Sequence, residues 1–236
     1  DPVLDRALNA ENEIPTDFTE QLSVRNDIKK TVDAVPITQD LLNLFPSKFE
    51  QTEGGAWVPL GWKIKPINDA IERLNVGKKY SSKTVLEYGQ VPVLDQGKSG
   101  VIGYHNEQPS FKASPKDPVI LFANHTCYMK LVMFDFSAIQ NVLPFKGKDL
   151  NIFWVYMATI GRQTFQEYKG HWPDFSILPV CIANNGLDDK FGEFVQPLFE
   201  KMHSNSCESE QLSLIRDTLL PKLISGEVTI STLQEN

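Results

Sequence analysis

Polar and basic side chains gather in the segments that we predict to be loops. Lys and Arg bind phosphates and guanine, Gln and Asn hydrogen-bond adenine, and Thr contacts the thymine methyl group, so these residue types suit a surface that reads duplex DNA. Loop residues are polar in most proteins, so solvation remains the alternative role for each one. The residues concerned are Lys78, Lys79, Lys83, Gln96, Lys98, Ser99, Asn124, His125, Thr126, Lys130, Arg162, Gln163, Tyr168, Lys169, His171 and Trp172.

Catalytic motifs are missing from the sequence. It contains no GxSxG, HExxH, GxxxxGKS/T or GxGxxG pattern, and no Asn/Asp-Pro-Pro-aromatic run like that of amino methyltransferases. His125 lies near Cys127, but two ligands are too few for a zinc site. The three cysteines, Cys127, Cys181 and Cys207, form no CxxC pair, which favours reduced, structural thiols. We therefore expect no catalytic residue, metal or cofactor in this chain.

The composition is typical of a globular protein that buries a core, because 41% of its residues are hydrophobic and 22% are charged. The net charge of −7 argues against binding to phosphates unless positive charge is concentrated in one region. Lys and Arg do outnumber Asp and Glu in residues 61–171, while both flanks are acidic. No apolar run approaches the roughly 18 residues of a membrane span, and no signal segment is visible. We expect a cytoplasmic protein with no membrane partner.

Short apolar segments separated by turns predict a domain of mixed strands and helices. The turn-rich stretch Gln51–Pro59 is typical of a connector. Helices are expected from Thr16 to about Ala34 and at Ile37–Phe45, Pro66–Leu74 and Leu150–Ile160. Strands are expected at Trp62–Lys65, Val91–Leu94, Val101–Tyr104, Val119–Phe122, Tyr128–Phe136 and Ile177–Ile182.

Beyond about Asp188 the sequence has an apolar stripe with alternating spacings of three and four residues. This spacing predicts one long helix, or a pair of helices, to about Ile224, with Pro197 kinking its first part or marking a first turn. A single helix cannot bury such a stripe alone, so a partner helix is expected. The residues predicted to pack against it are Phe194, Val195, Leu198, Met202, Leu212, Ile215 and Leu219.

Several motifs resemble those of the specificity (S) subunits of type I restriction–modification systems, in the order of that family and over nearly the whole chain. The segment VPVLDQGKSGVIGY contains the "DQG…GY" pattern, and the tail LIRDTLLPKLISGEV is similar to the helix end that closes these subunits. Further similar segments are Leu44–Phe49, Trp57–Trp62, Pro118–Phe136, Tyr168–Phe175 and Leu178-Pro179.

The resemblance implies an α/β (α+β) target-recognition domain with a long C-terminal helix of coiled-coil type. It suggests a helical or irregular spacer at residues 1–57, the recognition domain at 58–186, and the conserved helix and tail at 187–236. Mapped onto this sequence, Lys78 and Lys79 would contact phosphates. The other expected DNA contacts are Gln96, Lys98, Ser99, His125, Thr126, Lys130, Lys169 and His171.

The resemblance also implies partners. Such a subunit is not catalytic: it reads double-stranded DNA, docks modification (methyltransferase) subunits, and is joined by restriction subunits in the full complex. S-adenosylmethionine, ATP and Mg²⁺ are then expected on the partner subunits. With one recognition domain and one terminal helix, the chain is similar to a C-terminal half, which could form a symmetric self-dimer.

Two other classes stay open. A nuclease or methyltransferase fused to such a domain is disfavoured by the missing cofactor and metal motifs. A protein-interaction module without DNA binding is compatible with the acidic total charge.

Overall fold

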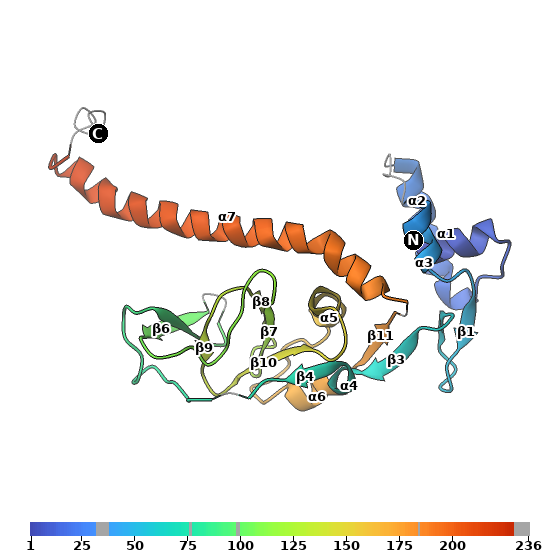
Figure 1. Ribbon diagram of the computed structural model, residues 1–236, viewed down its shortest axis with the longest axis horizontal. Helices are drawn as coiled ribbons and strands as arrows, with labels where there is room; N and C mark the ends of the chain where they lie inside the picture. Colours follow the sequence, from blue (N-terminus) through green and yellow to red (C-terminus); the bar gives the residue numbers. More distant parts are fainter. Residues whose placement is uncertain (32–37, 76, 98–99, 184, 229–236) are drawn as a thin grey trace. The chain divides into compact units, whose positions relative to one another are not determined.

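The computed structural model describes residues 1–31, 38–75, 77–97, 100–183 and 185–228 (Figure 1). The chain divides into two compact units, Asp1–Glu193 and the part from Phe194 onward. The described residues mix helices and strands and end in a long helix, so the predicted fold class is confirmed. None of the described helices is both long and apolar enough to cross a membrane.

The centre of the first unit is a four-stranded antiparallel sheet with the order β4-β10-β7-β8. All five residues of β7 are buried, because a central strand is covered on both faces. Successive side chains of a strand point to opposite faces of the sheet. The strands are β4 (Ile71–Arg73), β10 (Val142–Gly147), β7 (Val119–Ala123) and β8 (Met129–Val132).

Two apolar clusters follow this alternation. Ile120 and Phe122 belong to one cluster, whereas Val119 and Leu121 belong to the other. The Phe122 cluster includes residues of the short helices that pack against it, whose bounds are α4 (Ile67–Ala70), α5 (Ile152–Thr159) and α6 (Trp172–Ser176).

The Leu121 cluster lies against a smaller sheet with the order β6-β5-β9. Its β5 and β6 form an antiparallel pair with a bulge at Val93/Leu94, and β9 runs parallel to β5. The next loop begins where β5 ends, and this places the Asp95–Gly97 turn beside the end of β7. The bounds are β5 (Val91–Leu94), β6 (Val101–His105) and β9 (Ser137–Ala138).

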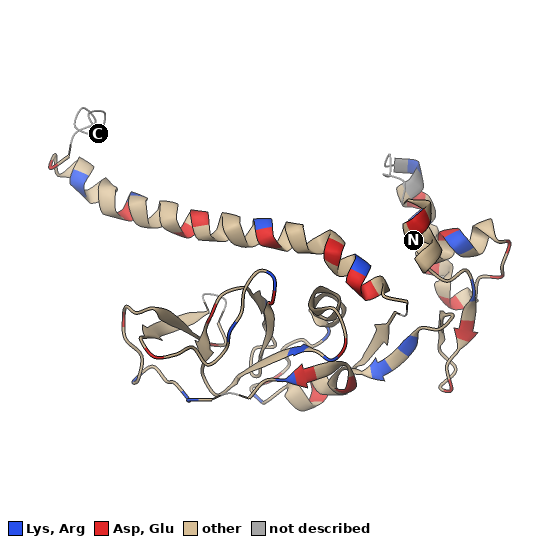
Figure 2. Ribbon diagram, viewed as in Figure 1, with Lys and Arg blue, Asp and Glu red and all other residues tan. Residues whose placement is uncertain are grey.

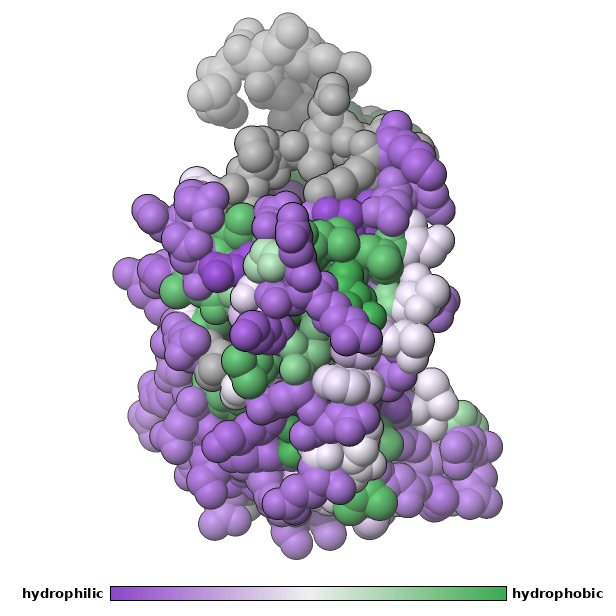
Figure 3. Space-filling view, turned by 90° about the vertical axis from the view of Figure 1, so that its right-hand side faces the viewer, coloured by the Kyte–Doolittle hydropathy of each residue, from purple (hydrophilic) through white to green (hydrophobic). Residues whose placement is uncertain are grey.

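The N-terminal part of this unit is helical and ends in a hairpin. Thr38 caps α3, because its Oγ1 accepts a hydrogen bond from the backbone of Leu41. On the face shown in Figure 3, apolar residues interrupt an otherwise hydrophilic surface. The elements are α1 (Pro2–Asn9), η1 (Thr16–Phe18), α2 (Thr19–Thr31), α3 (Gln39–Leu44), β1 (Phe49–Gln51) and β2 (Trp57–Pro59), of which β1 and β2 form the hairpin. The next strand, β3 (Lys63–Pro66), pairs with β11 (Pro179–Ile182).

The long helix α7 (Leu187–Ile224) begins inside the first unit. The buried Asp188 accepts a hydrogen bond from the backbone of Asn151, the residue that caps α5 (2.9 Å). Gly192 packs so closely that an added Cβ would lie 2.2 Å from Asn151 Nδ2. Any side chain at Gly192 would therefore displace the Asn151 side chain that caps α5.

Several predicted elements differ from those observed. The helix expected over Pro66–Leu74 is wrong beyond Ala70, because Ile71–Arg73 pairs with β10 as an edge strand and tertiary pairing overrides the local preference. The expected strand Tyr128–Phe136 is limited to β8. The connector Gln51–Pro59 contains strand β2, and β10 was not predicted, since Pro144 and Gly147 interrupt its apolar pattern.

Candidate nucleic-acid interface

Two loops that the sequence singled out are joined by side-chain hydrogen bonds. The backbone N–H of His125 donates to Gln96 Oε1 (2.8 Å), and Thr126 Oγ1 donates to the Gln96 carbonyl (2.8 Å). These residues are 29 and 30 positions apart and come from the turn after β5 and the turn after β7. The first turn is held by Asp95, which accepts a bond from Gly97 N.

A third loop, between α5 and α6, packs against His125 of the second loop. Tyr168 stacks nearly parallel on His125, with ring centroids 5.0 Å apart, and is itself 85% exposed. His125 Nδ1 lies 2.9 Å from the Lys169 carbonyl, so Nδ1 must be the donor. We refer to Gln96, His125, Thr126, Tyr168 and Lys169 as the loop cluster.

Asn124 fixes the third loop in place. Its Oδ1 accepts the backbone N–H of Trp172 (2.9 Å), and its carbonyl accepts that of His171 (2.8 Å). Gly170 lies against the Asn124 amide, where an added Cβ would be 2.9 Å from Nδ2. Asn124 is thus a positioning residue for the loop cluster, a role that its polar type alone does not reveal.

Not all predicted contacts are equally accessible. His171 is fully buried, and its Nε2 lies 3.0 Å from the Glu167 carbonyl, so its side chain supports the loop from inside. Lys169 lies between Asp174 (3.2 Å) and Glu167 (3.4 Å), whose carboxylates raise its pKa. Lys98 and Ser99 lie outside the described residues.

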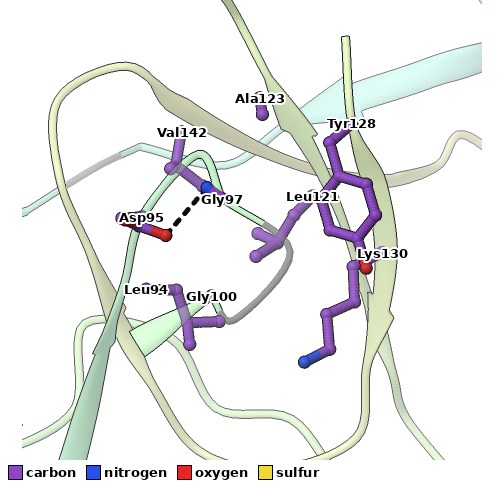
Figure 4. Close-up of a pocket in the computed structure, with 9 residues that line it drawn as sticks. All are labelled: Leu94, Asp95, Gly97, Gly100, Leu121, Ala123, Tyr128, Lys130 and Val142. Carbon is purple, nitrogen blue, oxygen red and sulfur yellow. Dashed lines mark hydrogen bonds between the residues drawn. The ribbon is translucent and has the colours of Figure 1, made fainter. Parts of the chain in front are cut away.

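A small pocket lies beside the Asp95–Gly97 turn (Figure 4). Figure 4 shows Tyr128 and Lys130 on the opposite side of the pocket from Asp95 and Gly97. Lys130 therefore belongs to the same edge of the domain as the loop cluster. The remaining lining residues are Leu94, Gly100, Leu121, Ala123 and Val142.

Acidic partners neutralise some of the lysines in residues 61–171, and Figure 2 shows the two signs interspersed. In the part of the chain that the structure describes, Arg73, Lys79 and Lys130 have no carboxylate partner, in contrast to the paired lysines. Those pairs are Lys78–Glu107, Lys112–Asp135 and Lys146–Asp117, in addition to Lys169.

The two neighbouring lysines predicted to bind phosphate have different surroundings. Lys78 donates to Glu107, which raises the pKa of Lys78 and lowers that of Glu107. Lys79 instead lines a separate groove with Arg73.

The groups that could suggest catalysis have structural roles. His105 Nε2 lies 2.8 Å from Ser137 Oγ, but both side chains are buried, so no substrate reaches this Ser–His pair. Burial raises the pKa of the Cys127 thiol, which disfavours its reactive thiolate form. Among the described residues, no three His, Cys, Asp or Glu side chains are grouped to hold a metal ion.

The apolar stripe of α7 is largely exposed. Phe194, Leu198, Met202, Leu212 and Ile215 are 73%, 57%, 65%, 58% and 52% exposed, and Val195 and Leu219 are half-buried. Monomeric proteins rarely expose apolar surface in such a continuous arrangement.

The fold and these two surfaces define an α/β binding domain with a long helix. Known proteins similar to this chain are specificity subunits of type I restriction enzymes. The MjaIX subunit of Methanocaldococcus jannaschii is 24% identical over 201 residues, and the EcoR124I/EcoR124II subunit of Escherichia coli is 35% identical over 201 residues. The alignments cover 75% and 76% of this chain but 46% and 47% of those proteins, so the chain spans about half their length.

A solved structure supports the fold. The type I restriction–modification S subunit of M. genitalium matches with a TM-score of 0.50 and 18% identity, over 69% of this chain and 45% of that one. No protein-family model matches the sequence. The chain belongs to the type I specificity subunits, as its motifs indicated.

Proposed function

We propose that this chain is a non-catalytic DNA-recognition subunit of a type I restriction–modification complex and reads one half of a bipartite site through the loop cluster. The observation that carries this proposal is the joining of Gln96, His125 and Tyr168, from three separate loops, into one exposed surface. Groups held in place before binding lose less conformational entropy when they meet a base. The names of the related proteins support a role in sequence specificity.

The exposed stripe of α7 is the proposed docking surface for a helix. Modification subunits are the expected partners, and a second copy of this chain would be an alternative occupant. In this proposal S-adenosylmethionine, ATP and Mg²⁺ bind to the modification and restriction subunits. A filter-binding assay with labelled S-adenosylmethionine should therefore detect binding only when the modification subunit is present.

The central test is selection of bound duplexes from a randomised pool at about 0.1 M salt, with and without the modification subunit. One enriched motif is expected, and its symmetry reports whether one or two copies bind. If nothing is enriched while the two proteins still co-elute, the chain is a docking module. The net charge of −7 and the neutralised lysines favour that second candidate.

Two variants of Gln96 separate reading from positioning. Gln96→Ala removes the acceptor for His125 N–H as well as the amide donor, and should cost about 1–3 kcal/mol at one base position. Gln96→Glu keeps the acceptor but removes the donor. Equal discrimination by Gln96→Glu and the wild type in a competition assay would show that Gln96 only positions the loops.

A further inference from the structure

A second polar groove lies at the edge of the central sheet, with a volume of about 360 Å³. Arg73 pairs with Phe145 in the sheet register, and Leu143 is two residues from Phe145, so strand alternation places Arg73 and Leu143 on the face of the Phe122 cluster. Val142, which lines the pocket in Figure 4, points to the other face. The residues that line the groove are Arg73, Leu74, Asn75, Lys79, Gln140 and Leu143.

The polar groups of this groove are all able to donate hydrogen bonds, and two of them are cationic. Among the residues that the structure describes, no Asp or Glu lines it. The adjacent Glu72 pairs with Lys146 in the register and points to the opposite face from Arg73. Such a set of groups suits an oxyanion.

Arg73 is oriented for this role by stacking. Its guanidinium lies 4.7 Å from the Trp172 ring centroid. A guanidinium held beside an aromatic ring can still make a bidentate contact with an oxyanion through its N–H groups. The backbone N–H of Trp172 also donates to Asn124 Oδ1, and Asn124 precedes His125, so Trp172 and Asn124 link Arg73 to the loop cluster.

We propose that this groove binds a backbone phosphate of duplex DNA next to the bases that the loop cluster reads. The inference rests on the proposed function and deepens it, because it assigns phosphate binding to Arg73 and Lys79 and excludes Lys78. The exclusion follows from Glu107, which already neutralises Lys78.

The two adjacent lysines provide a matched pair of variants. Lys79→Gln and Arg73→Gln in the full chain should weaken binding of all duplexes alike, and each should reduce the slope of log affinity against log salt by up to about 0.9, the value for one phosphate. Lys78→Gln should leave the slope unchanged. All three side chains are exposed, so folding should be preserved, and thermal unfolding checks this.

The outcomes separate the two proposals. If Lys79→Gln and Arg73→Gln behave like Lys78→Gln while Gln96→Ala still loses base discrimination, the groove assignment is overturned and the proposed function stands. If the wild-type chain binds no duplex even at low salt, with or without the modification subunit, both are overturned. The Arg73 Nε–H resonance distinguishes a phosphodiester from a free anion: a shift with duplex supports the proposal, and a shift only with inorganic phosphate at matched ionic strength overturns it.

Discussion

The loop cluster and the stripe of α7 differ in whether contacts within the chain already hold their side chains. The loop cluster is held by bonds within the first unit, such as Gln96 to His125 and Asn124 to Trp172. The stripe leaves Phe194 and Met202 73% and 65% exposed. The first surface is therefore organised before a ligand arrives, whereas the second leaves its apolar side chains uncovered.

The largest expected effect is on α7. The double variant Leu198→Asp, Ile215→Asp should reduce docking of the modification subunit by about 3–6 kcal/mol, because burying each apolar side chain contributes about 1.5–3 kcal/mol. The unfolding temperature of the first unit should not change, since both residues belong to the second unit. Analytical gel filtration with the modification subunit measures the first effect and calorimetry the second.

Gln211→Asp and Thr218→Asp, at exposed polar positions of the same helix outside its apolar stripe, are the matched controls. Full docking by the Leu198/Ile215 variant would show that the stripe is not the interface. A lowered unfolding temperature would instead show that the first unit depends on it.

A smaller effect is expected at the loop cluster. Asn124→Ala leaves the Trp172 N–H without its acceptor and should destabilise the first unit by about 1–3 kcal/mol. Base discrimination should fall with it, because the third loop loses its anchor. Asn124→Asp keeps the acceptor oxygen and should retain most of the stability in urea unfolding. If Asn124→Ala unfolds like the wild type, the loops are not held in the way described.

The smallest effect concerns pH and the first unit alone. Burial lowers the pKa of His105, whose neutral ring accepts a bond from Glu107 N–H and stacks on Tyr80 at 4.4 Å. The unfolded chain then takes up this proton near its ordinary pKa of about 6.5, before the folded chain does. This contribution to stability is present above about pH 6.5 and declines as the pH falls toward the lowered value.

Urea unfolding at pH 7 and pH 5 measures this decline, and His105→Gln should show a smaller one. An equal decline in the variant would assign the pH dependence to other groups.

Much of the secondary structure could be predicted from local patterns in the sequence. Buried strands with continuous apolar runs, such as Val119–Ala123, and the long helix were predictable, because their periodicity reflects local backbone geometry. The candidate residues Gln96, His125 and Thr126 were predictable as residue types in loops. The resemblance to the family then named the same three residues as expected DNA contacts.

Which of these residues meet, and which are buried or paired, depends on the tertiary packing. Strand β4 forms because a partner strand is present, and no local signal specifies that pairing. The buried His171 and the exposed Tyr168 are three residues apart in one loop, and only packing distinguishes them. Lys78 and Lys79 are the same residue type at adjacent positions, yet only Lys78 is neutralised by Glu107, which lies 29 positions away from it. Charge pairing over such separations depends on the folded path of the chain and is invisible to composition or spacing.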